Sequence, residues 1–332
     1  MVLGLTAGAI VCPGRALATG GLDVGDPGSE PVVRVLLASG QFAPPAPLDA
    51  WSFAWEGRTY RGTPASVALP GGRTGLVDAV PLDAYLYGVL GRELDAGWPG
   101  AAQRAQAIVA RTYARLRLRP QAPYDVAAGS IGQGYRGIAD ESPEGRGAVD
   151  ATAGLIVSDG GAPAKVAYSA CCGGHTADAA LVWGTGAPYL RGVADPYCTN
   201  CPDYDWSVQL EVAALTRAFG ADFAALGNLT GATLGPRGLD TRPQAVGFTG
   251  ATGSLDEAAV ALRNRVGPGL VRSAFYRSLA LDARAQRLTL AGTGLGHGVG
   301  LCQWGARGLA ATGASAQAIV AFYFPGTTLA RA

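Results

Sequence analysis

The chain has 332 residues, of which 48% are hydrophobic and 15% charged, so it can build a substantial apolar core. Its formal net charge of +1 lacks the basic excess typical of nucleic-acid-binding proteins, and nucleic acid is therefore excluded as the expected partner. Its 50 glycines and 21 prolines are dispersed along the chain, which indicates a loop-rich folded protein rather than a disordered one.

The first 20 residues have the features of the end of an export signal. Residues 2–11 form an apolar run that is too short to span a bilayer. Ala16, Leu17 and Ala18 form the small-x-small pattern that signal peptidase accepts, so we expect cleavage after Ala18. We therefore expect residues 1–18 to be a signal peptide and the mature protein to lie in the periplasm or cell wall.

Residues 19–76 are expected to form linkers and a small β-rich lead-in. Gly71 and Gly72 make a plausible hairpin turn. The stretches that resemble strands are 32–37, 51–55 and 66–69.

The hydrophobic pattern then changes to helical spacing, and we expect residues 77–195 to form the catalytic core of the protein. Pro81 suits the first position of a helix. The residues that follow place one apolar face at helical spacing, namely Leu82, Tyr85, Leu86, Val89 and Leu90. A second helix is predicted from about residue 101 to 118, and the two helices should pack as a hairpin.

The rest of the chain is expected to add an inserted lobe and to complete the core. We predict the lobe at 196–292, with helices near 211–219 and 255–265. Residues 293–332 should return to the core with a glycine-rich loop and helices at about 302–311 and 315–323. The predicted class is α+β, with a helical hairpin packed on β-rich surroundings.

Glu93 is the most informative single residue. On the first helix it falls at the centre of the apolar stripe made by Leu82, Leu86 and Val89. Desolvation there raises the pKa of a carboxyl group, which lets it donate a proton to a departing glycosidic oxygen. The alternative is a structural residue at a frayed helix end, paired with an arginine such as Arg92.

A conventional glycosidase needs a second carboxylate, and none stands out. Asp83 faces away on the helix, and Asp95 falls in a turn. In a lytic transglycosylase the substrate's own 6-hydroxyl attacks, so one carboxyl group can serve first as acid and then as base. The single glutamate therefore favours that mechanism.

Two histidines and the five cysteines that would remain after cleavage are the other candidates for chemistry. His175 and His297 both lie among glycines, which let the backbone approach a ligand closely. Export favours a disulfide from Cys171 or Cys172 to Cys198 or Cys201, with Cys302 a buried free thiol. The alternative is a zinc site with ligands at zinc-like spacing, namely Cys172, His175, Cys198 and Cys201.

Several linked motifs resemble the SpoIID/LytB (stage II sporulation protein D) family. The resemblance covers about residues 58–198 and 293–329. The matching segments are VPLDAYLYGVLGREL at 80–94, WPGAAQRAQAIVARTYA at 98–114, AVDATAGLIV at 148–157, YSACCGGHT at 168–176, VWG at 182–184, PYLRGVADPYC at 188–198, GHGVGLCQWGARGLA at 296–310 and FYFPGTTL at 322–329.

The resemblance implies an enzyme that cleaves peptide-stripped peptidoglycan strands and leaves 1,6-anhydro-muramic acid ends, with Glu93 as general acid/base. Peptidoglycan glycan strands are the expected partner. Some relatives enhance a cell-wall amidase instead, which gives the alternative function and a second partner. By position, the expected substrate contacts are Gln106, Tyr168, Ser169, His175, His297 and Gln303.

We expect no cofactor and no metal. Some members of the family carry a zinc-binding segment with cysteine and histidine where this chain has residues 124–137, and here that segment contains neither. Sporulation is not implied either, because the family also occurs in organisms that do not sporulate.

Overall fold

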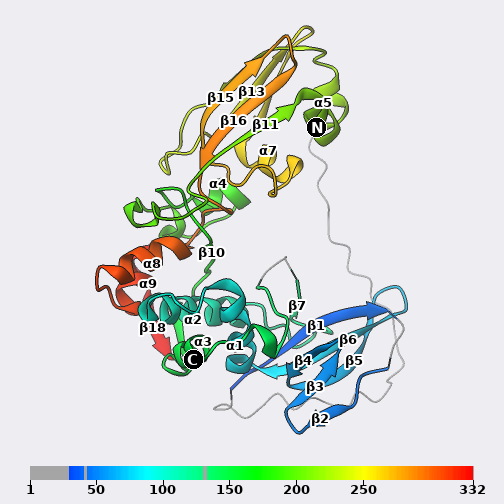
Figure 1. Cartoon of the computed structure of the whole chain (residues 1–332), viewed down its shortest axis with the longest axis vertical. Helices are drawn as coiled ribbons and strands as arrows, with labels where there is room; N and C mark the ends of the chain where they lie inside the picture. Colours follow the sequence, from blue (N-terminus) through cyan, green and yellow to red (C-terminus); the bar gives the residue numbers. More distant parts are fainter. Residues whose placement is uncertain (1–29, 41–42, 130–132, 332) are drawn as a thin grey trace.

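The computed structural model describes residues 30–40, 43–129 and 133–331. The predicted signal peptide lies outside the described residues. The described chain is elongated, with a β-rich N-terminal part and a helical middle at one end and a second β-rich lobe at the other (Figure 1). The mixed helices and small sheets confirm the predicted α+β class. Within the described ranges, no helix combines the length and apolarity needed to cross a membrane.

Two sheets form the N-terminal part. A four-stranded sheet has the order β5-β6-β1-β7, and a three-stranded sheet has the order β2-β3-β4. Gly71 and Gly72 join β5 to β6 with φ of 76° and 71°, which confirms the predicted turn. The strands are β1 (Val32–Gly40), β2 (Pro47–Asp49), β3 (Ser52–Trp55), β4 (Arg58–Arg61), β5 (Thr63–Leu69), β6 (Arg73–Pro81) and β7 (Val126–Ala127).

The predicted helical hairpin is present as α1 (Leu82–Glu93) and α2 (Gly100–Arg115). Helix α1 starts directly after β6, and its predicted apolar face is buried. Helix α2 is buried on almost every side because it packs against α1, α3 (Pro143–Asp150), α8 (Gln303–Ala311), α9 (Ala316–Tyr323) and β8 (Leu155–Asp159). The small alanines of α2 allow these close approaches.

A buried ion pair ties the two helices together. Arg111 Nε on α2 lies 2.8 Å from Asp83 Oδ1 on α1, and the Arg111 side chain is only 2% exposed. The same guanidinium also donates to the carbonyls of Val149 and Leu155. Because a buried charge is costly unless it is paired, this network specifies how the hairpin meets α3 and the start of β8.

The C-terminal segment returns to the helical middle. Strand β10 (Tyr168–Ser169) pairs in parallel with β17 (Leu301–Cys302), so two segments 133 residues apart run side by side, with Tyr168 opposite Leu301. Helix α8 begins immediately after β17. Strand β18 (Thr328–Arg331) pairs with β8, which also pairs with β9 (Ala162–Pro163).

Residues 205–293 build the lobe around a hydrophobic core of its own. Its helices near the predicted positions are α5 (Val212–Phe219) and α7 (Ala259–Val266). The second starts later than predicted because residues 254–258 form β14 instead. The other strands are β11 (Asp205–Glu211), β12 (Leu229–Leu234), β13 (Ala245–Gly250), β15 (Tyr276–Asp282) and β16 (Arg287–Thr293). The domain boundaries remain predictions.

Candidate active site

Glu93 lies at the last position of α1, where three distant segments meet. Its Oε1 atom accepts a hydrogen bond from the Gly134 backbone N–H at 3.2 Å. Its Oε2 atom accepts one from Gln303 Nε2, on the first residue of α8, at 3.4 Å. The side chain is half-buried. The carboxyl group is therefore held in one orientation without an arginine or lysine bonded to it in the described chain.

The surroundings raise the pKa of Glu93 above its ordinary value. Burial is the main cause, because desolvation disfavours the charged form. The hydrogen bonds from Gly134 and Gln303 lower the pKa, as does the neighbouring Tyr168 hydroxyl. Together they do not cancel the effect of burial. A raised pKa favours the protonated carboxyl group, which is the form that can release a proton to a leaving oxygen.

Glycine makes the close approach beside Glu93 possible. A Cβ atom at Gly91 would lie 1.6 Å from the Asp140 carbonyl oxygen, so only glycine lets residues 138–141 pass against α1. On the same helix, a Cβ at Gly88 would lie 3.2 Å from the Gly137 carbonyl oxygen. The segment after Gln133 can therefore run along α1 and present its Gly134 N–H to the carboxylate.

Tyr168 reaches Glu93 from β10. The hydroxyl is buried and has no hydrogen bond of normal geometry within the described residues. Burial, followed by the charge of Glu93, raises the pKa of this phenol well above its ordinary value. Its ring lies 6.1 Å from that of Tyr113 in an edge-on arrangement. The phenol is therefore a neutral donor beside the carboxyl group.

Two glutamines near the hairpin also have unsatisfied amides. Both Gln106 side-chain polar atoms are buried without a partner in the described part of the chain. Gln133 donates to the Ala110 carbonyl at 3.1 Å, but its Oε1 atom is likewise unpaired. Each such atom costs about 1–3 kcal/mol, so a cluster of them is expected where a ligand or water supplies the partners.

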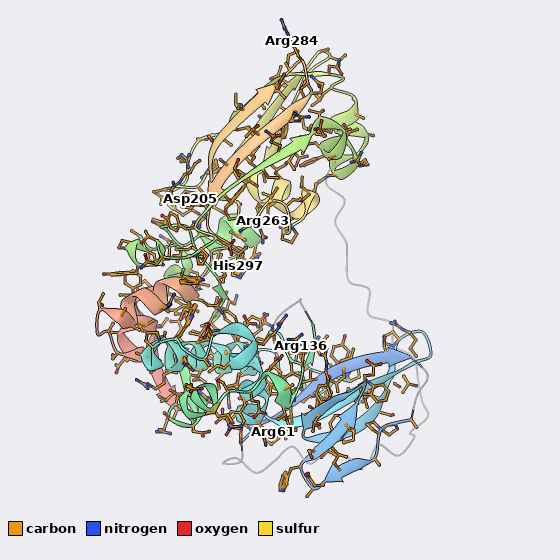
Figure 2. The ribbon with its side chains drawn as sticks, in the orientation of Figure 1. Arg61, Arg136, Asp205, Arg263, Arg284 and His297 are labelled. Atoms are coloured by element: carbon orange, nitrogen blue, oxygen red, sulfur yellow. The ribbon has the colours of Figure 1, made fainter. Side chains whose placement is uncertain are left out.

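The glycine-rich loop at 294–300 is anchored by Ser169 and contains His297. Ser169 Oγ accepts a hydrogen bond from the Gly298 N–H at 3.2 Å. His297 Nδ1 accepts one from the Val299 N–H at 3.0 Å, which leaves Nε2 as the protonated nitrogen. Burial, with a contribution from Arg263, lowers the pKa of His297 to about 4, so its ring is neutral at pH 7. Figure 2 shows His297 where the lobe meets the helical middle.

The expected contact residues thus separate into two groups. Tyr168 and Gln303 lie beside Glu93, and Ser169 follows Tyr168 on the same strand. No hydrogen bond joins Gln106, His175 or His297 to Glu93 within the described chain. The His175 Nδ1 atom is instead 2.8 Å from the Thr176 carbonyl oxygen.

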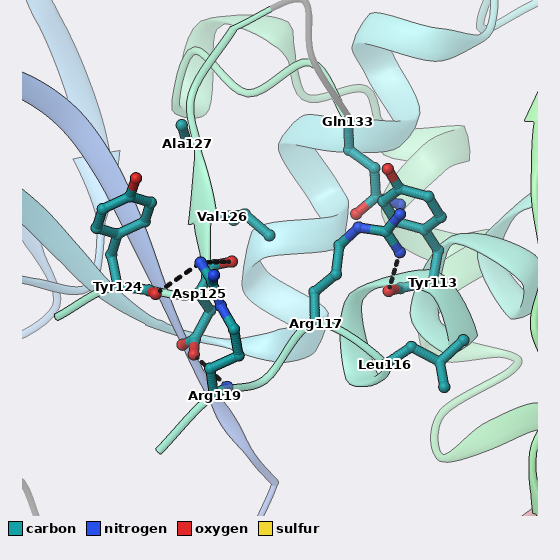
Figure 3. A pocket seen from close by; sticks show the side chains of 9 residues that line it. All are labelled: Tyr113, Leu116, Arg117, Arg119, Tyr124, Asp125, Val126, Ala127 and Gln133. Carbon is teal, nitrogen blue, oxygen red and sulfur yellow. Dashed lines mark hydrogen bonds between the residues drawn. The ribbon is translucent and has the colours of Figure 1, made fainter. Parts of the chain in front are cut away.

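A cavity of about 300 Å³ opens beside this site (Figure 3). Gln133 and Tyr113 line it and also border Tyr168. The Arg117 guanidinium carbon lies 3.1 Å from the centre of the Tyr113 ring, and Arg117 Nη1 donates to the Tyr113 carbonyl. These residues were not among the predicted contacts. The four-residue spacing of Tyr113 and Arg117 at the end of a helix was the available signal.

Comparison with known proteins gives one family model and several relatives. The model for Stage II sporulation protein (SpoIID) matches residues 71–158. An uncharacterized protein of Brachyspira hyodysenteriae is 32% identical over 258 residues, covering 76% of this chain and 68% of the relative. The chain belongs to the SpoIID family.

Two Bacillus subtilis relatives carry functional names. Stage II sporulation protein D is 24% identical, over 82% of this chain and 81% of that protein. The amidase enhancer is 27% identical over 74% of this chain but only 40% of its own length. Membership of the SpoIID family associates the protein with the bacterial cell wall.

The span that matches the SpoIID model contains Glu93, Gln106 and Gly134, but not the residues that complete the site. Tyr168 comes from β10 and Gln303 from α8, both outside residues 71–158. The site of this SpoIID-family chain is therefore assembled from the matched segment and from the C-terminal return of the chain.

The cysteines differ from both sequence-based predictions. All five described cysteines are buried free thiols, so the predicted disulfide is not formed. The alternative zinc set is not brought together either, because Cys172 and Cys198 gather with Asp195 and Cys302 rather than with His175 and Cys201. Asp195 lies three residues before Cys198, but the expected zinc ligands were drawn from cysteine and histidine alone.

Proposed function

We propose that this protein is a lytic transglycosylase that cleaves peptide-stripped peptidoglycan strands and leaves 1,6-anhydro-muramic acid ends. The observation that carries the proposal is the half-buried Glu93 carboxyl group, whose pKa is raised by burial. It is oriented by Gly134 and Gln303. We propose further that the protein acts outside the cytoplasm, where such strands lie.

Glu93 would act in both halves of the reaction. As an acid it gives its proton to the glycosidic oxygen while the bond between that oxygen and C1 of muramic acid breaks. As a carboxylate it then takes the proton of the muramoyl 6-hydroxyl, whose oxygen forms the new bond to C1. The enzyme ends as it began, and no water is consumed.

The other carboxylates near the hairpin support a mechanism with one carboxyl group. Asp83 is paired with Arg111, and Asp140 with Arg136. Asp95 Oδ1 accepts the Gly97 N–H in the turn between the two helices. A hydrolase with two carboxyl groups needs a free second carboxylate facing the first. These three carboxylates are bound to other partners than Glu93.

The cavity beside Tyr113 supports the choice of peptide-stripped glycan. Removing the stem peptide leaves a free lactyl carboxylate on muramic acid, whereas an intact strand carries a neutral amide there. Arg117 and Arg119 bring positive charge to the cavity walls. Guanidinium groups bind carboxylates through charge-assisted hydrogen bonds, so this cavity favours the stripped strand.

Product analysis tests the proposal directly. Peptide-free strands are incubated with the protein and with Glu93→Gln, and the fragments are identified by mass spectrometry. We expect anhydro-ended fragments from the wild type, and a loss of about 10²–10⁴ in rate for the variant. Wild-type turnover by Glu93→Gln would contradict the assigned role.

A second function is favoured by the relative named amidase enhancer. In that case the same site would hold glycan without cleaving it, and the protein would stimulate a cell-wall amidase. Retention of strands by both the wild type and Glu93→Gln, with no fragments from either, would support this function. A purified amidase assayed with and without the protein would then measure the stimulation.

A further inference from the structure

Three cysteine sulfurs and one carboxylate oxygen converge at a buried point away from Glu93. The residues are Cys172, Asp195, Cys198 and Cys302, all buried, and their ligand atoms lie within 4.8 Å of one another. Cys172 Sγ is 3.6 Å from Cys198 Sγ and 3.2 Å from Asp195 Oδ2. Three separate segments supply the four side chains, so only the tertiary structure brings them together.

These spacings fit a tetrahedral metal site. With metal–sulfur bonds of about 2.3 Å, two thiolate ligands of one zinc ion lie roughly 3.8 Å apart. The Cys172–Cys198 separation is already close to that value. A disulfide would use only two of the three sulfurs and would leave the third beside a buried carboxylate.

The surroundings of the four ligands favour anionic sulfur and a fixed carboxylate. Cys302 Sγ accepts N–H bonds from Cys172 at 3.2 Å and from Gly305 at 3.3 Å. The second of these places the sulfur at the N-terminal cap of α8, where negative charge is stabilised. Asp195 Oδ2 accepts the Tyr323 hydroxyl at 2.9 Å, which orients the carboxylate as an outer-shell partner does in metal sites.

A buried cation nearby matches the charge of such a site. The Arg242 guanidinium, 6% exposed, donates to the Cys172 carbonyl at 2.7 Å. Three thiolates and a carboxylate would be untenable in this apolar core alone. A divalent cation at their centre offsets half of that charge, and Arg242, although it also pairs with Asp240 at 3.8 Å, adds a positive group beside it.

We infer that Cys172, Asp195, Cys198 and Cys302 form a structural site for a divalent thiophilic metal, best fitted by zinc. All four positions are filled by protein, as in closed structural sites. The metal would join the loop at Cys172, the turn at Asp195 and Cys198, and the start of α8. Because Gln303 follows Cys302 directly, this junction also sets the position from which Gln303 reaches Glu93.

Metal analysis of the full chain tests the inference. The protein, purified without chelators under reducing conditions, is expected to contain about one zinc per chain. Cys198→Ser and Cys302→Ser should lose it, whereas Cys201→Ser, also buried but outside the four ligands, should keep it. Tyr323→Phe should weaken zinc binding about 10–100-fold, because the carboxylate loses its orienting partner.

Cobalt spectroscopy gives a readout that needs no variant. After zinc is removed with a chelator, Co²⁺ should produce thiolate charge-transfer bands and the strong visible bands of a tetrahedral site, and added zinc should remove them. Absence of these bands together with a Cys172–Cys198 disulfide, seen by mass spectrometry of the alkylated chain, would overturn the inference. Loss of metal in Cys201→Ser, equal to that in Cys198→Ser, would overturn the assigned ligands.

Discussion

Gln303 Nε2 donates a hydrogen bond to Glu93 Oε2 at 3.4 Å, joining the start of α8 to the end of α1 across 210 residues of sequence. Without this contact the two helices would still pack on α2, but among the described residues the carboxyl group would keep just the Gly134 N–H and the neighbouring Tyr168 hydroxyl. The contact therefore makes the C-terminal segment a part of the site rather than a support for it.

Gln303→Ala should change the pH dependence as well as the rate. Burial raises the pKa of Glu93, and the Gln303 hydrogen bond partly offsets that rise. Its loss should move the pKa further up, so the alkaline limb of activity, where a general acid loses its proton, should shift to higher pH. The rate at the optimum should fall because the carboxyl group is less well oriented. A pH–rate profile on stripped strands measures both effects, and an unchanged limb would contradict the contact's role.

Arg117→Gln should weaken the binding of stripped strands more than it slows their cleavage. Losing one charge-assisted hydrogen bond to a lactyl carboxylate should raise KM about tenfold. The matched control is Arg284→Gln, which removes the same charge from an exposed position at the far tip of the lobe (Figure 2). Equal KM values for Arg117→Gln and the control would show that Arg117 does not bind the substrate.

Asp78 should make the protein less stable as pH rises from about 4 to about 7. This carboxyl group is 0% exposed on β6, and burial raises its pKa to about 7, although the Tyr135 hydroxyl donates to it at 2.8 Å. Over this range the folded state keeps a proton that the unfolded state has released, so folding loses on the order of 4 kcal/mol. Urea unfolding at several pH values should show this slope in the wild type and a flatter one in Asp78→Asn.

His297 should stay neutral at pH values near 7. Its pKa is lowered to about 4, chiefly by burial. Because the folded pKa lies below the unfolded one, the stability that the neutral ring contributes is present above pH 6.5 and lost as pH falls toward 4. NMR titration of labelled histidine, assigned with His297→Gln, should show an inflection near pH 4. An inflection between pH 6 and 7 would show that the ring is open to water.

Some parts of this architecture follow from the sequence alone. The helical hairpin was predictable because Leu82, Leu86 and Val89 repeat at the helical period, and the same period places Glu93 on the buried face. The Gly71–Gly72 turn was predictable because two glycines between strand-like runs adopt positive φ without strain. Both features depend only on neighbouring residues.

Strand β6 was not predicted, and its position explains why. It pairs with β1 on one side and β5 on the other, and residues 75–80 are all buried. A strand that is covered on both faces has no polar and apolar alternation to recognise. Its existence depends on which partners the rest of the chain supplies.

The sequence by itself determined the hairpin, the place of Glu93 on its buried face and the family resemblance, because these depend on local spacing and on linked motifs. Only the tertiary structure decided what surrounds Glu93 and which groups join the cysteines. The Tyr168–Leu301 register brings Tyr168 and Gln303 to Glu93, and the same pairing sets Ser169 opposite Cys302. Asp195 takes the place predicted for His175 among the cysteines. Contacts between segments 100 or more residues apart leave no periodic trace in the sequence, because they depend on how whole elements pack.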